Sequence, residues 1–183
     1  MQSFKIIKPI HILTPYVRYY WILEDGADVS VSERTLPTGC IQLVFHRGKR
    51  LLLVGKKESQ PQAFICGQCL NFSDVMSAGK IEMITVVFQP YAARAILQLP
   101  LKFFYGELIA VDAIEDLELS ILSRKVIEAD DHETCIRLIE QFLIHRLYRF
   151  EGYEYNLKRI SAVLHQINEQ AKTIFLSYLK PHA

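Results

Sequence analysis

Two cysteines separated by two residues form the most obvious chemical motif in the sequence, Cys66-Gly-Gln-Cys69. Such a pair can bind zinc or form a redox couple, but zinc needs four ligands, and no second Cys-x-x-Cys or spaced histidine pair accompanies it. A thioredoxin-like pair also needs a helix N-terminus to lower the pKa of one thiol, whereas the neighbouring residues here have strand-like patterns. We therefore interpret the pair as incidental and all four cysteines as free thiols.

The histidines give no support to metal-dependent catalysis. They are scattered along the chain and form no His-x-His pair: His11, His46, His132, His145, His165 and His182. Metal-dependent oxygenases hold their ion through clustered histidines and a carboxylate. No nucleophile elbow, phosphate-binding loop or dinucleotide fingerprint is present either. The sequence predicts no metal, no cofactor and no enzymatic activity.

The aromatic run at residues 16–23 (YVRYYWIL) is the main candidate for ligand binding. Strand alternation would put Tyr19 and Trp21 on one face and Arg18 on the other. An interior lined by aromatic rings, with polar groups from residues 40–45 (CIQLVF), would suit a small organic effector. The candidate ligand-binding residues are Arg18, Tyr19, Trp21, Cys40 and Gln42. The alternative, an aromatic core that holds no ligand, stays open.

The first ninety residues carry the patterns of short strands, at residues 16–23, 40–45, 50–55, 63–67, 70–76 and 81–88. Gly48 suits a tight hairpin before the third of these strands. No segment with helical periodicity separates the strands. The sequence therefore predicts an antiparallel barrel or sandwich rather than a parallel sheet.

After Pro90 the pattern becomes helical. We expect a short helix over residues 91–99, stopped by Pro100, a second helix over residues 113–129, and a third with Asp131 as its N-cap. The apolar face of the third helix is wider than one core contact needs, which indicates a homodimer interface. The candidate dimer contacts are Ile136, Ile139, Phe142, Leu143 and Leu147. The alternative is that this face only packs on the barrel.

The charges are balanced, with 21 Lys and Arg against 20 Asp and Glu. This leaves no global basic field of the kind that drives sequence-independent binding to nucleic acid. The first fifteen residues (MQSFKIIKPIHILTP) are interrupted by charges and proline, so we expect no signal peptide, no membrane span and a cytoplasmic location. Arg18, Arg34 and Arg94 would meet an acidic effector if the fold brought them together, which their spacing does not require.

Three blocks carry a resemblance to a known family: RYYWILED, LPTGCIQLVFHRG and ITVVFQPYAARAILQLPLKFFYGELIAVDAI. In this order and spacing they resemble the N-terminal domain of a subgroup of AraC-type bacterial transcriptional regulators. The resemblance implies an α+β protein, with an antiparallel cupin-like β-barrel that senses an effector, followed by a C-terminal helical segment. Thr38 and Gln42 stand where the family commonly has acids, and Tyr91 and Ala92 where it has glycines, so ligand contacts of those acids are not carried over.

The tail, ISAVLHQINEQAKTIFLSYLKPHA, resembles the opening of an AraC-type helix-turn-helix module, whose recognition helix would lie beyond residue 183. The resemblance implies a sensing domain at residues 1–112, linker and dimerisation helices at 113–150, and the start of a truncated DNA-binding module at 151–183. The implied function is effector sensing and dimerisation in transcription regulation, with DNA bound only through the missing module and by no residue of this chain. The alternatives are a small cupin-like metalloenzyme and a ligand-free dimerisation or interaction protein.

Overall fold

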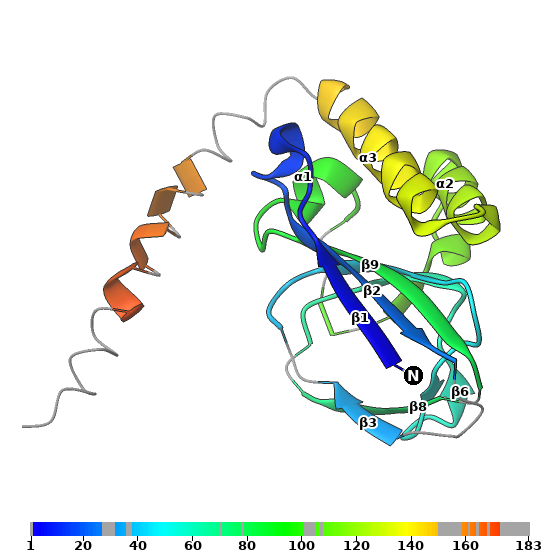
Figure 1. The fold of residues 1–183 in the computed structure, drawn as a ribbon. Helices are drawn as coiled ribbons and strands as arrows, with labels where there is room; N and C mark the ends of the chain where they lie inside the picture. Colours follow the sequence, from blue (N-terminus) through cyan, green and yellow to red (C-terminus); the bar gives the residue numbers. More distant parts are fainter. Residues whose placement is uncertain are drawn as a thin grey trace, which may run out of the picture.

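The structure is a computed structural model that describes residues 2–26, 32–35, 38–69, 71–77, 79–100, 105–106, 108–149, 159–160, 162–163, 165–167 and 169–172. The described residues form two antiparallel β-sheets facing each other, with helices covering the outer face of one of them (Figure 1). This arrangement confirms the predicted α+β class with antiparallel sheets. Among these residues neither sheet closes on itself.

The larger sheet has six strands. In spatial order these are β1 (Gln2–Ile7), β2 (Val17–Asp25), β9 (Ile81–Phe88), β4 (Gln42–His46), β7 (Ala63–Cys66) and β10 (Leu108–Ala110). The smaller sheet has the order β3 (Ser32–Thr35), β8 (Ser73–Met76), β5 (Leu52–Leu53) and β6 (Glu58–Ser59). The sequence patterns indicated β2, β4, β5, β7, β8 and β9, whereas β1, β3, β6 and β10 went unrecognised.

The larger sheet is buried on both faces. One face packs against the helices through Tyr20, Phe45 and Ile84, all 0% exposed. The other face packs toward the smaller sheet through Val44 and Met83, together with other side chains of the inter-sheet core. Because both faces are covered, residues 83–88 of β9 are buried in succession, which explains why this strand lacks an alternating polar pattern.

The helices beside the larger sheet are α1 (Ala93–Leu97), α2 (Leu117–Glu128) and α3 (His132–Tyr148), with 3-10 turns η1 (His11–Leu13) and η3 (Val111–Ala113). Asp131 caps α3 as predicted, because its carboxylate accepts a hydrogen bond from the Thr134 backbone N–H at 2.7 Å. The short helix α1 ends earlier than Pro100 suggested, at Gln98, which adopts the left-handed conformation with φ 57°.

The helices α2 and α3 form a pair that shares one hydrophobic core with the larger sheet. Arg146 of α3 donates to both carboxylate oxygens of Asp116, the N-cap residue of α2, at 2.6 and 2.7 Å. This ion pair joins the end of one helix to the start of the other. None of the described helices has the length and apolar character needed to cross a membrane.

The prediction of dimer contacts on α3 is wrong for its two central residues. Ile139 and Leu143 are 0% exposed and lie in the core between the helix and the larger sheet. Ile136, Phe142 and Leu147 are half-buried and pack against the same core. The wide apolar face is therefore occupied by the chain's own sheet and by neighbouring helices, which was the alternative interpretation. Dimerisation itself stays a prediction.

The predicted role of Gly48 is also wrong. Residues 47–49 do not form a tight hairpin between β4 and β5 but run against the start of β9, where the backbone N–H groups of Arg47 and Gly48 both donate to the Glu82 carbonyl. Of the predicted helix-turn-helix start, residues 159–160, 162–163, 165–167 and 169–172 are helical. Residues 150–158 and 173–183 lie outside the described residues, as does the remainder of the predicted module.

Candidate ligand-binding cavity

A cavity of about 420 Å³ lies between the two sheets. Its volume is within the range of sites that bind small organic molecules. One wall is the inner face of the larger sheet, and the opposite wall comes from the smaller sheet and its connecting turns, including Thr35, Leu53, Ser73 and Asp74. The cavity is therefore a consequence of two sheets that face each other at a distance which their own side chains do not fill completely.

Strand register explains which side chains of the larger sheet face the cavity. Trp21 pairs with Thr85, Thr85 with Val44, and Val44 with Phe64, so these residues form one row across β2, β9, β4 and β7. Residues directly opposite each other in adjacent strands point to the same face. Trp21, Val44 and Phe64 of this row line the cavity and give it an aromatic and aliphatic wall.

A second row lies one pleat further along. Gln42 pairs with Val87 on one side and with Cys66 on the other, and Cys66 pairs with Leu108 of β10. Gln42, Cys66 and Leu108 line the cavity. This row adds an amide and a thiol to the apolar wall, and the Gln42 Nε2 group donates to Thr38 Oγ1 at 3.2 Å.

Three of the five predicted ligand-binding residues, Trp21, Cys40 and Gln42, line the cavity. Tyr19 is half-buried and Arg18 is exposed, and neither belongs to the lining. The register is irregular between Val17 and Tyr19, so Arg18 falls outside the alternation on which the prediction relied. Tyr19 itself pairs with Val87 and keeps the face of Trp21. Arg18 instead lies beside the cavity residue Cys40, with its Nη1 atom 3.7 Å from the Cys40 sulfur. Ligand binding by these five residues stays a prediction.

The fold does not bring Arg34 and Arg94 together. Arg34 makes a two-point ion pair with the cavity residue Asp74, at 2.8 and 3.2 Å. The Arg34 hydrogen bond holds the pKa of the Asp74 carboxyl below its usual range. Arg94 lies on α1, which packs into the core on the opposite face of the larger sheet. An acidic effector therefore cannot be bound by these arginines together.

His46 is a buried polar residue beside the cavity, and no motif in the sequence indicated its role. It is 0% exposed, and its Nε2 lies 2.9 Å from Oε1 of Gln60, which lines the cavity. Burial lowers the pKa of His46, so the ring is neutral and Nε2 donates this bond. The arrangement fixes the Gln60 side chain and leaves its amide N–H₂ group as a donor for other partners.

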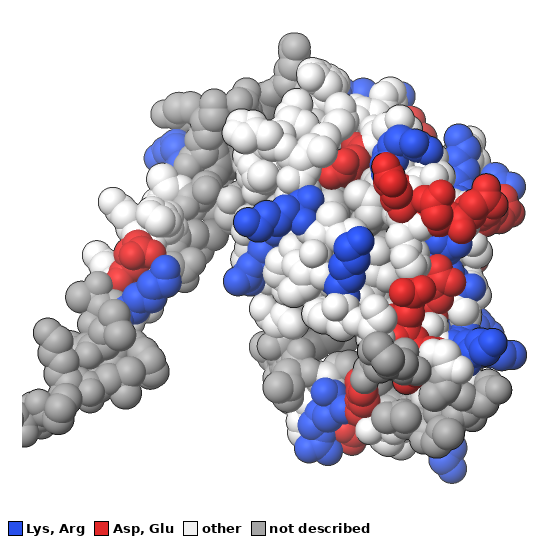
Figure 2. Space-filling model, viewed as in Figure 1, with Lys and Arg blue, Asp and Glu red and all other residues white. Residues whose placement is uncertain are grey.

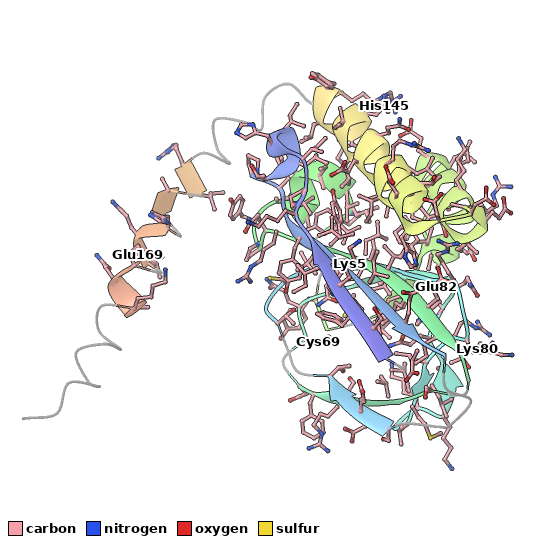
Figure 3. The ribbon with its side chains drawn as sticks, in the orientation of Figure 1. Lys5, Cys69, Lys80, Glu82, His145 and Glu169 are labelled. Atoms are coloured by element: carbon pink, nitrogen blue, oxygen red, sulfur yellow. The ribbon has the colours of Figure 1, made fainter. Side chains whose placement is uncertain are left out.

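The two cysteines of the Cys-x-x-Cys motif both line the cavity, as does Cys40. Cys69, labelled in Figure 3, lies between the larger sheet and β3. Cys66 and Cys69 donate to the same Gly67 carbonyl oxygen at 3.7 and 3.6 Å. Burial, together with the neighbouring Cys69, raises the pKa of the Cys66 thiol to about 12. No three His, Cys, Asp or Glu side chains gather into a metal-binding group anywhere in the described ranges.

A polar junction connects the larger sheet to the turn between α2 and α3. Oε1 of Glu82 on β9 forms an ion pair with Nε of Arg47 at 3.2 Å and contacts Nε2 of His132, the first residue of α3, at 3.0 Å. Figure 3 shows Glu82 close to this turn. Arg47 also donates to the Ala129 carbonyl and to the sulfur of Cys135 on α3. The neighbour of Glu82 in β9, Met83, lines the cavity, so one strand contacts both regions.

The fold and cavity define an α+β domain with a small-molecule-sized space between two antiparallel sheets. Residues 5–110 match the family model described as a domain of unknown function (DUF6597), and the chain belongs to this family. The matched residues include every side chain that lines the cavity. A search of curated proteins found no match.

Proposed function

We propose that this chain is the effector-sensing region of an AraC-type bacterial transcriptional regulator acting in the cytoplasm. In this proposal the two sheets correspond to an incompletely closed cupin-like barrel, and the cavity between them binds a small organic molecule. The observation that carries the proposal is the cavity, whose wall contains Trp21, Cys40 and Gln42. The resemblance of the three sequence blocks to that family supports the same function.

The lining chemistry favours an uncharged ligand with an aromatic or aliphatic body. Trp21 and Phe64 offer surfaces for stacking, and Gln42 and Gln60 offer amide groups for a few directional hydrogen bonds. The carboxylate of Asp74 is already paired with Arg34 and attracts no ligand charge of its own. Binding would therefore depend on apolar burial, with the amides selecting the orientation.

Strands β4 and β9 are the proposed route from the cavity to the helices. Val44 and Met83 face the cavity, while Phe45 and Ile84 on the same strands face the helical core. An occupant that moves either strand must repack α2 and α3, because a close-packed core does not deform continuously. Differential packing of these helices would set the orientation of the DNA-binding module that residues 151–183 are proposed to begin.

DNA contact and dimerisation are further parts of the proposal. On the face shown in Figure 2, lysines and arginines are dispersed and acidic side chains form a band, so the visible charge is mixed. The proposed regulator would bind DNA through the module that residues 151–183 are proposed to begin. A homodimer would use a surface other than the core-facing side of α3, because Ile139 and Leu143 are buried there.

A cavity-filling variant tests the proposal. Val44 lines the cavity, and Val44→Phe would place a larger side chain in it; Leu117→Phe changes a side chain that is 74% exposed on α2 and serves as the control. The probe is a library of neutral fragments of about 10–18 heavy atoms, screened by ligand-observed NMR. We expect binders to the unmodified chain and to Leu117→Phe that lose affinity for Val44→Phe. Binders that are unaffected by Val44→Phe, or a complete lack of binders, would contradict the proposal.

A further inference from the structure

The Cys66 and Cys69 thiols are the reactive groups that the proposed sensing function does not use. Both are half-buried, line the cavity and donate to the same carbonyl oxygen of Gly67. Their sulfurs lie close together, because both approach the same Gly67 carbonyl oxygen within 3.7 Å. The other two cysteines differ, because Cys40 is 4% exposed and Cys135 is 0% exposed.

We propose that Cys66 and Cys69 form a dithiol site that low-molecular-weight disulfides oxidise to an intrachain disulfide. The site goes beyond the sensing function and does not depend on it, because it needs no effector and no DNA. Its location gives it access to solvent through the cavity. The spacing of two residues, with Gly67 directly after β7, lets the chain turn back so that both sulfurs meet.

The reaction proceeds by two exchange steps. The Cys69 thiolate attacks one sulfur of the disulfide RSSR, forming a mixed disulfide and releasing RS⁻. The Cys66 thiol then gives its proton to the released RS⁻ as its sulfur attacks the Cys69 sulfur of the mixed disulfide, forming the Cys66–Cys69 bond and releasing the second RS⁻. The two leaving thiolates take up the two protons that the cysteines lose. The protein dithiol is oxidised, and RSSR is reduced to two RSH.

The surroundings of the two thiols assign these roles. Cys66 is the last residue of β7 and is held in the cavity wall, where burial raises its thiol pKa to about 12. Cys66 is also paired on both sides, with Leu108 of β10 and Gln42 of β4, whereas Cys69 lies after the end of β7, so the first attack on RSSR falls to Cys69. The absence of thiolate stabilisation at Cys66 also favours the oxidised state, because stabilised thiolates are what make a disulfide easy to reduce.

The bond would restrain one end of the cavity. Gln68, between the two cysteines, donates to the Gly39 carbonyl at 3.0 Å and pairs with Tyr105 in an isolated bridge. Gly39 immediately precedes the cavity residue Cys40. Oxidation therefore acts on the segment after β7, which is hydrogen-bonded to the residues before β4. Its immediate effect is limited to this end of the cavity.

The test uses the intact chain, reduced and then incubated with oxidised glutathione, followed by thiol counting and peptide mass mapping. We expect two of the four thiols to disappear and a Cys66–Cys69 linked peptide to form. Cys66→Ser should accumulate a glutathione adduct on Cys69, whereas Cys69→Ser should stay unmodified at Cys66 over the same time. Cys40→Ser is the matched control and should behave like the unmodified chain.

Several results would overturn the proposal. Four thiols that persist in the unmodified chain would show that the pair is not oxidised by disulfides, and a linked peptide containing Cys40 or Cys135 would show that the wrong pair was assigned. An adduct on Cys66 in Cys69→Ser, with none on Cys69 in Cys66→Ser, would refute the assigned order. The thermal unfolding midpoint of each variant verifies its folding, and Cys66→Ala replaces Cys66→Ser if the serine variant does not fold. Fragment binding in the cavity is measured separately, so either proposal can fail alone.

Discussion

The replacement of Gly48 by alanine tests whether the segment after β4 is held against β9 as closely as the structure indicates. The backbone N–H groups of Arg47 and Gly48 donate to the Glu82 carbonyl at 2.7 and 3.1 Å, and that of Lys49 donates to the Lys80 carbonyl at 2.8 Å. A Cβ atom at position 48 would lie 2.7 Å from both the Glu82 nitrogen and the Lys80 oxygen. These are backbone atoms, so they cannot rotate away.

The expected destabilisation follows from this contact. Real Cβ atoms essentially never approach other heavy atoms within 3.0 Å, so the segment must move away from β9 and lengthen its three hydrogen bonds. Overpacking of this kind costs about 1–3 kcal/mol, and each weakened hydrogen bond costs about 0.5–1.5 kcal/mol. The lower entropy of the unfolded alanine chain offsets about 0.4–1 kcal/mol. We expect Gly48→Ala to reduce the free energy of unfolding by at least about 2 kcal/mol.

Urea denaturation measures this difference, with Gly55→Ala as the matched control. A Cβ at Gly55 meets nothing within 4 Å, and Gly55 has no left-handed φ angle. The control should therefore differ from the unmodified chain by less than about 0.5 kcal/mol, or be slightly more stable. If Gly48→Ala unfolds at the same urea concentration as Gly55→Ala, the described approach of residues 47–49 to β9 is incorrect.

Three further predictions concern buried groups. Arg146→Met should lower the free energy of unfolding in urea by about 3 kcal/mol, because it leaves the Asp116 carboxylate without its partner. Ile139→Ala should lower it by about 2–5 kcal/mol, with no change in molar mass by light scattering, since Ile139 lies in the chain's own core. Burial lowers the pKa of His46 in the folded state below the ordinary value of 6.5, so the unfolded chain binds a proton more readily. The free energy of unfolding should therefore fall as the pH drops from 6.5 toward the pKa of His46 in the folded state. His46→Gln should flatten this part of the stability profile, and an unchanged slope would refute the assignment.

The antiparallel β-rich front half was predictable because its central strands carry strong local signals. The run at residues 16–23 and the segment at 40–45 are rich in aromatic and β-branched residues, and both became central strands of the larger sheet. The strands that were missed lack this signal. The β3 residues are all exposed, and β6 has only two residues, so neither shows an apolar pattern. β3 pairs with β8, which is distant in the sequence, and β6 pairs only with the two residues of β5, so the local sequence gives little indication of either strand.

The cavity was predictable in part for the same reason. Alternation along β2 was enough to indicate Trp21, and the neighbouring pattern indicated Cys40 and Gln42. The irregular register between Val17 and Tyr19 could not be predicted from the residue types. The direction of the Arg18 side chain therefore could not be predicted from strand alternation. The cysteine pair was interpreted as incidental because it has neither a helix N-terminus nor further zinc ligands beside it. Neither criterion predicts which surface the end of a strand lines. The pairing of β7 with β4 is what brings Cys66 to the cavity.

Ligand binding in the cavity is tested most directly by an NMR titration of the ¹⁵N-labelled chain with the fragment of highest affinity from the library screen. If the cavity binds the fragment, we expect saturable changes in the NMR signals of the Trp21 indole and of the Gln42 and Gln60 side-chain amides. The backbone amide signal of His132, at the start of α3, should shift in parallel. The same titration of Val44→Phe should show none of them. Shifts confined to residues outside the cavity, or cavity shifts that leave the start of α3 unchanged at saturation, would contradict the claim that this space binds a molecule and reports it to the helices.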